Sequence, residues 1–292
     1  MLDLGIISDE VSDDFERSCA LIAAWGLAHV ELRMLWGKNI LELSETELVR
    51  AQAALNEHKL EVTAIASPIF KSPLDGKPRQ MQADFALGGA ESYEAQLVLL
   101  DKAAGLCRRF GTRKLRVFTF WREPWSDALV RAVSDKLIQA AEVARARDTL
   151  LVVENEPVCA VATGEELGAL FKLIRERAPK DLLDHLAALW DPGNALAAGE
   201  RAYPDGYDAL DACPIAHVHL KDLTRHGKGK PHFVPLGQGD IDYLAQVRRL
   251  IEDGYRGTLV LEPHYRPSDL SQEEAAHASV KAAQAVLREA LS

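Results

Sequence analysis

Four short motifs in the second half of the chain each place a polar side chain after an apolar run. They span residues 151–155, 189–194, 217–222 and 259–264, and each contains one metal-ligating residue: Glu154, Asp191, His219 and Glu262. Three carboxylates and one imidazole form a mostly oxygen ligand set, which suits Mn²⁺, Mg²⁺ or Co²⁺ better than a closed structural zinc site built on thiolates, with Zn²⁺ as a further option. The sequence therefore predicts a catalytic divalent metal site.

A divalent ion held by four protein ligands keeps coordination positions for two oxygens of a substrate. Such an ion polarises a carbonyl group and makes the adjacent C–H more acidic, while an oriented carboxylate removes the proton. Glu154 and Glu262 follow different strands, so they approach a central substrate from different sides and suit the roles of base and conjugate acid. Each glutamate alone also fits a solvated rim residue or a salt-bridge partner, but the four motifs together favour the metal site.

The motif at 217–222 carries two imidazoles and a lysine on one side of a strand. His217, His219 and Lys221 are spaced two residues apart, so their side chains point the same way. His219 lies nearer the carboxyl end of the strand and is the better ligand, whereas His217 is either a hydrogen-bonding core histidine or a group that orients the ligand. We also include His217 among the candidate substrate contacts. Lys221 is expected to bind a substrate hydroxyl, to steady an enolate or to pair with a carboxylate.

The first half of the chain offers weaker candidates for substrate contacts. Glu31 and Arg33 share one face of a strand and form either an internal ion pair or contacts to a sugar. Lys71 and Trp121 lie just beyond two further strands, where a tryptophan either covers an apolar sugar face or packs in the core. The pair at 9–10, Asp-Glu, ends the first strand and is expected to be a solvated rim.

Short apolar runs alternate with longer stretches of helical periodicity along the whole chain. Capping-box patterns at Ser44 with Glu47 and at Thr163 with Glu166 support two of the helix starts. The predicted strands lie near residues 2–8, 29–35, 61–67, 114–120, 149–154, 186–191, 215–221 and 257–262. The predicted helices lie near residues 12–25, 44–58, 93–110, 126–147, 164–177, 204–212, 242–253 and 271–290.

Eight β/α units in one chain predict an α/β fold, a single (β/α)₈ TIM barrel that forms one catalytic domain over residues 1–292. A doubly wound open sheet is the rival, but it normally carries a glycine-rich first turn, and residues 8–12 contain no glycine. Catalytic groups of a barrel gather at the carboxyl ends of its strands, which is where the four motifs fall. Two long connections, 71–92 and 224–240, are expected to lie over the same mouth.

Composition excludes several classes of protein. The formal net charge of −10 over 292 residues argues against a nucleic-acid partner, because phosphate binding needs clustered lysines and arginines. The four cysteines are scattered and read as reduced core thiols. No apolar run reaches the length of a membrane span and no signal peptide is recognisable, so we expect a cytoplasmic protein without membrane contact.

Taken together, the motifs resemble the xylose isomerase-like TIM-barrel superfamily, which comprises sugar isomerases and epimerases and includes inosose dehydratase and endonuclease IV. The resemblance covers essentially the whole chain and implies Glu154, Asp191, His219 and Glu262 as the metal ligands. It also implies substrate contact by Arg225, which stands six residues beyond the metal-binding histidine, as in the ketose 3-epimerases. Homodimers and homotetramers are frequent in the superfamily.

Two positions separate this chain from the subfamilies. The ketose 3-epimerases have a histidine three residues after the ligand aspartate, whereas this chain has Asn194, which we include among the substrate contacts. The His-x-His-x-Lys-Asp segment at 217–222 resembles the inosose dehydratase branch instead. Endonuclease IV holds three zinc ions with additional His and Asp ligands and faces DNA with a basic groove, whereas this chain has neither a matching set of histidines in its first half nor the positive charge.

The sequence supports three hypotheses about function. The leading hypothesis is a metal-dependent isomerase or epimerase that acts on a carbohydrate or keto-polyol through an enediolate. The second is a lyase or dehydratase that uses the same proton abstraction but expels a β-substituent from a keto-sugar or inosose. The third is a barrel that binds a sugar or a partner protein without catalysis, and the complete set of ligand types argues against it.

Overall fold

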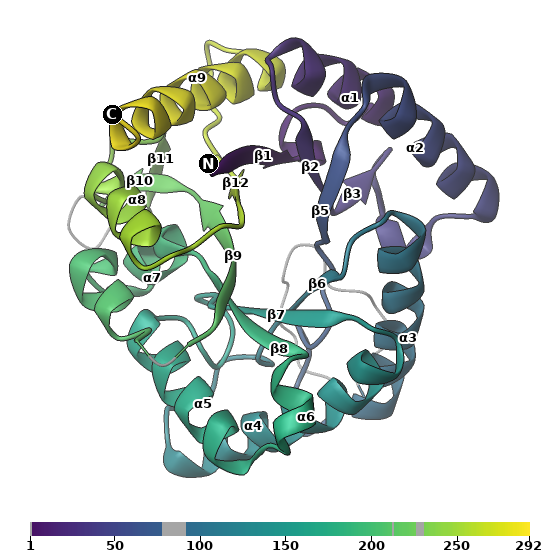
Figure 1. Ribbon diagram of the computed structural model, residues 1–292, viewed down its shortest axis with the longest axis vertical. Helices are drawn as coiled ribbons and strands as arrows, with labels where there is room; N and C mark the ends of the chain where they lie inside the picture. Colours follow the sequence, from purple (N-terminus) through teal and green to yellow (C-terminus); the bar gives the residue numbers. More distant parts are fainter. Residues whose placement is uncertain (1, 78–91, 212, 226–230) are drawn as a thin grey trace.

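In the computed structural model, eight parallel strands close into a barrel, which forms the inner ring of Figure 1. Four of these strands carry the polar motifs. The structure describes residues 2–77, 92–211, 213–225 and 231–292. Around the barrel the strands follow the order β1-β12-β9-β8-β7-β6-β5-β2. Their bounds are β1 Asp3–Ile7, β2 His29–Leu32, β5 Glu61–Ile65, β6 Lys114–Val117, β7 Leu150–Glu154, β8 Leu186–Trp190, β9 Ile215–Leu220 and β12 Thr258–Leu261. The predicted TIM barrel is confirmed.

Helices form the outer ring of Figure 1 and cover the strands. The long ones are α1 Phe15–Ala24, α2 Glu45–His58, α3 Tyr93–Arg109, α4 Asp127–Ala146, α5 Gly164–Arg177, α8 Tyr243–Glu252 and α9 Gln272–Ala290. Their starts follow local capping chemistry. Ser44 and Glu47 form the predicted capping box of α2. Thr163 caps α5, but the Glu166 side chain accepts from the Ala162 N–H instead of completing a box.

The connection after β8 differs from the prediction of a helix at 204–212. Helix α7, Pro192–Ala198, begins directly after the strand, and an irregular π-type segment, Ala202–Gly206, follows it. The side chain of Asp191 caps α7, and Pro192 occupies the first helical position. An N-cap aspartate followed by proline is a recognised helix start, so the sequence did contain this signal.

Shorter elements complete the fold. Two small antiparallel ribbons pair β3 Met34–Leu35 with β4 Lys38–Asn39, and β10 Asp222–Thr224 with β11 His232–Val234. Two 3-10 segments, Ser8–Glu10 and Ile40–Glu42, and helix α6, Lys180–Leu183, lie in other connections. Of the two long connections predicted over the mouth, residues 78–91 and 226–230 lie outside the described part of the chain.

Burial on both sides explains why the strands read as apolar runs. Every residue of β8 is buried, because its side chains face either the barrel interior or the covering helices. The four cysteines are free thiols, three of them buried and Cys213 half-buried. None of the helices in the described ranges is both long and apolar enough to cross a membrane.

Candidate metal centre and active site

The four predicted ligands meet in one buried cluster at the carboxyl end of the barrel. Glu154 ends β7, Asp191 follows β8, His219 lies in β9 and Glu262 follows β12. One ligand atom from each lies within 4.8 Å of the others, and all four residues are buried. The strands are neighbours in the barrel, so residues up to 108 positions apart in sequence share one small volume. Tertiary structure thus assembles the ligand types that the sequence placed at separate strand ends.

Helix capping fixes the orientation of Asp191. Its Oδ1 accepts a hydrogen bond of 2.8 Å from the Asn194 backbone N–H, which leaves Oδ2 facing the cluster. The side-chain nitrogen of Asn194 donates to the Asn155 carbonyl at 2.9 Å and lies 3.3 Å from Glu154 Oε1. Asn194 therefore positions two of the four ligands as well as bordering the cavity described below.

The imidazole of His219 is held by a carboxylate on its far side. Its Nε2 lies 3.2 Å from both oxygens of Glu31, whereas Nδ1 faces Glu154 Oε1 at 3.4 Å and Glu262 Oε2 at 3.6 Å. Burial opposes protonation, but the surrounding carboxylates raise the pKa of His219 well above its ordinary value. Metal-binding histidines commonly donate their second N–H to a carboxylate in this way, so Nδ1 is the atom available to an ion.

Glu31 and His217 lie beside His219, and neither lines the cavity described below. Both are fully buried, and Glu31 Oε2 is 2.6 Å from His217 Nε2. Burial lowers the pKa of His217 to about 4, so its ring is neutral at pH 7. The prediction that these two residues contact substrate is replaced by a supporting role, because the barrel interior at this depth is filled by side chains.

A buried arginine that the sequence reasoning missed contacts Glu154. Arg116, on β6, places Nη1 3.3 Å from Glu154 Oε2, and its Nε and Nη2 donate to the carbonyls of Ser67 and Ala66. Although burial raises the pKa of Glu154, Arg116 and His219 more than offset it and hold the carboxyl below its usual range. The available signal was an arginine between two apolar residues, Leu115 and Val117, inside a strand, where a buried charge needs a partner.

Arg33 occupies the corresponding place beside Glu262. Its Nη1 pairs with Glu262 Oε1, while Nη2 lies 2.8 Å from Asp9 Oδ2 and 2.7 Å from Glu10 Oε1. The expectation of a solvated rim at 9–10 is wrong, because Glu10 is only 4% exposed and is neutralised by Arg33 and Arg266. The sequence alone does not tell whether two acidic residues at a strand end face water or pair with an arginine 23 residues away.

Lys221 supplies a third cation to the cluster. Its Nζ lies 2.9 Å from Asp191 Oδ2 and 2.8 Å from Glu262 Oε2. Burial opposes the ammonium form, but these carboxylates raise the pKa of Lys221 above its ordinary value. Burial also raises the pKa of Asp191, to about 6, although Lys221 acts in the opposite direction. Of the three roles expected for Lys221, the structure shows the pairing with carboxylates.

The donor set fits a divalent ion. His219 Nδ1, Glu154 Oε2 and Asp191 Oδ2 are buried and make no hydrogen bond within the described part of the chain. Asp191 Oδ2 pairs with Lys221 and Glu154 Oε2 with Arg116, but buried polar atoms are nearly always hydrogen-bonded as well, so three such ligand atoms in one cluster fit a metal site. Glu154, Asp191, His219 and Glu262 would hold the ion, with oxygen and nitrogen donors that suit Mn²⁺, Mg²⁺, Co²⁺ or Zn²⁺.

A cavity of about 430 Å³ opens above the cluster. Apolar side chains that line it include Phe118 and Phe233. Its charged and polar lining consists of Arg33, Lys71, Arg116, Glu154, Glu156, Asn194, Lys221, Glu262 and His264. The cavity thus combines hydrogen-bond donors, acceptors and aromatic faces, and its volume is within the range of small-molecule pockets.

Two predicted substrate contacts lie away from this cavity. Trp121 is 5% exposed, pairs through its backbone with Ser72 and is absent from the described lining, so its role is packing. Arg225 is exposed, and its Nη1 donates to the Leu196 carbonyl near the end of α7, where a helix terminus attracts a cation. Phe118 provides the aromatic face instead, with Lys71 Nζ 4.6 Å from its ring centre.

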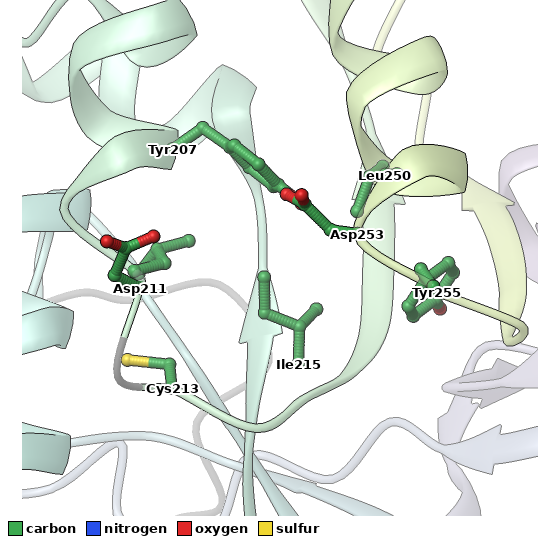
Figure 2. A pocket seen from close by; sticks show the side chains of 9 residues that line it. Tyr207, Asp211, Cys213, Ile215, Leu250, Asp253 and Tyr255 are labelled. Carbon is green, nitrogen blue, oxygen red and sulfur yellow. The ribbon is translucent and has the colours of Figure 1, made fainter.

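A second cavity, of about 390 Å³, lies at the amino end of β9. Figure 2 shows that its side chains come from the residues before β9 and from the end of α8 and the segment after it, with Ile215 at the start of the strand. Tyr207 OH donates to Asp253 Oδ2 at 3.1 Å, and Tyr255 OH donates to the Thr258 carbonyl at 2.9 Å. Both tyrosine hydroxyls and the Asp253 carboxylate of this cavity thus already have protein partners.

Comparisons with known proteins agree with this architecture. The model of a family described as xylose isomerase-like TIM barrel matches residues 19–290. No protein in a search of curated proteins matches the chain.

Several solved structures have the same fold. The IOLI protein with a bound zinc atom is 17% identical, with a TM-score of 0.74 and 99% of both chains covered. The probable 3-DHS dehydratase AsbF from Bacillus anthracis is 16% identical, with a TM-score of 0.69 over 97% of this chain and 99% of that one. The 3-keto-D-glucoside 4-epimerase YcjR from E. coli is 18% identical, with a TM-score of 0.69 over 99% and 100%. These structural neighbours therefore include an epimerase and a dehydratase.

Proposed function

The chain belongs to the xylose isomerase-like TIM-barrel family, and from this premise we propose that it is a divalent-metal-dependent isomerase or epimerase of a sugar or keto-polyol. The observation that carries the proposal is the buried cluster of Glu154, Asp191, His219 and Glu262 beneath a polar cavity. A bound ion would supply Lewis acidity at a substrate carbonyl. The small-molecule partner is a carbohydrate, and a homodimer or homotetramer remains part of the prediction.

The chain's own residues then move the proton at the carbon beside that carbonyl. Glu154 is the stronger base of the two glutamates, because Glu262 contacts both Arg33 and Lys221, whereas Glu154 has Arg116 as its cationic neighbour. In an epimerisation the opposite side of the enediolate would be reprotonated from the Glu262 side.

The cavity lining orients the rest of the substrate. Lys71 and Glu156 lie 3.8 Å apart at its wall and offer a donor and an acceptor to hydroxyl groups. Phe118 and Phe233 supply apolar surface to the C–H faces of a sugar.

A screen of ketoses, inososes and 3-keto sugars in D₂O tests this proposal. We expect deuterium to enter the substrate at a carbon beside its carbonyl, to stop entering after chelation and to resume after addition of Mn²⁺, Mg²⁺, Co²⁺ or Zn²⁺. Full turnover by protein that metal analysis shows to be free of ions would overturn it.

A lyase reaction is the second candidate, and Lys221 is the observation that favours it. Its ammonium lines the cavity, so it is placed to donate a proton to a departing hydroxyl, which leaves as water. The same screen separates the two reactions, since elimination removes one water from the substrate mass and creates an α,β-unsaturated carbonyl, whereas isomerisation or epimerisation keeps the mass.

A further inference from the structure

Lys221 is nearly as buried as the cluster itself. The residue is 3% exposed, and its Nζ contacts Asp191 Oδ2 at 2.9 Å and Glu262 Oε2 at 2.8 Å. Both contacts are within the range of a charge-assisted hydrogen bond or close ion pair. The ammonium therefore already supplies positive charge to two of the four carboxylate and imidazole ligands.

The fold holds Lys221 rigidly at this place. Its backbone N–H and carbonyl both bond to the Tyr243 hydroxyl, at 3.1 and 2.6 Å. Opposite the stem, a Cβ on Gly193 would lie 2.4 Å from the Lys221 carbonyl oxygen and 2.9 Å from its Cγ. A glycine at 193 thus leaves the room that the lysine needs to reach Asp191.

An ion in the cluster would share its ligands with this ammonium. Asp191 and Glu262 are one half of the proposed ligand set, and the four ligand atoms span no more than 4.8 Å. Two positive charges so close together in a buried site repel each other strongly, because little solvent screens them. Binding of the ion therefore has to displace or weaken the lysine contacts.

We propose that Lys221 is a resident counter-cation that competes with the divalent ion for Asp191 and Glu262. It neutralises and positions the two carboxylates in the metal-free protein, and it lowers the affinity of the site so that the ion exchanges. The competition part rests on the proposed metal-dependent function, whereas the counter-cation part does not.

Metal affinity tests the competition. Mn²⁺ is titrated by calorimetry into chelator-stripped wild-type protein and into Lys221→Met, which keeps the length of the apolar stem. We expect the variant to bind Mn²⁺ at least about tenfold more tightly, because the competing charge is gone. The matched control is Lys71→Met, a lysine of the same cavity that lies 3.8 Å from Glu156, and its affinity should equal that of wild type. Equal or weaker binding by Lys221→Met overturns the competition.

Thermal unfolding in the presence of chelator tests the counter-cation role. Lys221→Met should melt several degrees below wild type and below Lys71→Met, because buried carboxylates lose their cation. Adding Asp191→Asn should recover part of the loss, since asparagine caps a helix as well as aspartate does but carries no charge.

The outcomes are separable. If Lys221→Met fails to fold without metal, recovery of folding in the double variant supports the proposal and its absence overturns it. If neither wild type nor Lys221→Met binds Mn²⁺, Mg²⁺, Co²⁺ or Zn²⁺, the proposed metal-dependent function fails, and the order of melting temperatures alone decides whether Lys221 is a counter-cation.

Discussion

The two ends of strand β9 open onto cavities of similar size, about 430 Å³ at the carboxyl end and about 390 Å³ at the amino end, but their chemistry differs. At the carboxyl end, side chains from several strand ends converge and leave buried polar atoms without hydrogen bonds. At the amino end, Tyr207 and Tyr255 have hydrogen-bond partners within the protein. Cavity volume therefore does not distinguish the two ends, whereas the convergence of buried ligand atoms that lack hydrogen bonds does.

The difference follows from how a parallel barrel is built. All carboxyl ends of the strands meet at one mouth, so residues that follow different strands face a common centre. At the amino end the cavity is bounded instead by the segments that enter the strands, such as the residues from Asp253 to Tyr255 before β12. Substitutions at the two ends should accordingly have unequal consequences.

The largest expected effect is on turnover. Glu154→Gln should lower kcat by about 10² to 10⁴, because a general base is lost while the side-chain volume is kept. The counterpart at the amino end is Asp253→Asn, which should leave kcat within about twofold of wild type. Rate measurements on the substrate found in the deuterium screen decide this, and a similar loss in both variants would contradict the distinction between the two ends.

Metal addition should stabilise the protein through the cluster at the carboxyl end of the barrel, and not through the cavity at the amino end. An ion at 100 times its Kd adds about 2.7 kcal/mol to the free energy of unfolding. Calorimetric melting should show this gain in wild type and in Asp253→Asn, and its loss in Asp191→Asn. If Asp191→Asn is stabilised by the ion as much as wild type, the cluster is not the binding site.

Glu31 should affect the metal affinity although it is not one of the four proposed ligands. Glu31→Gln removes the carboxylate that orients His219. Loss of such a supporting group typically weakens metal binding by about 10- to 100-fold. Mn²⁺ titration provides the measurement. Glu61→Gln, at the exposed amino end of β5, is the matched control and should bind Mn²⁺ like wild type.

The smallest effect should come from the apolar wall of the amino-end cavity. Ile215 is half-buried at the start of β9, so Ile215→Val should lower the free energy of unfolding by less than about 1 kcal/mol. Its kcat and Mn²⁺ affinity should stay at wild-type values. Loss of metal binding in this variant would show that the two ends of β9 are coupled.

Sequence reasoning succeeded where the signal was local. Strand β7 was recognisable as a short apolar run, and Glu154 as the polar residue that ends it. It failed where a residue's partner lies far along the chain: Arg33 and Glu262 are 229 positions apart, and Glu31 and His217 are 186 apart. Strand periodicity tells which side a residue faces but not which charges from other strands face the same point.

What the sequence by itself determined was the order of the eight barrel strands, most of the helices between them and the four ligand types at strand ends, because hydrophobic periodicity and the residues that follow each run are local features of the sequence. Only the tertiary structure decided that Arg116 contacts Glu154, that Glu31 supports His219 instead of a sugar, and that Lys221 lies against Asp191 and Glu262. The physical reason is that barrel closure sets strand neighbours and heights, and these alone determine which buried charges must neutralise one another.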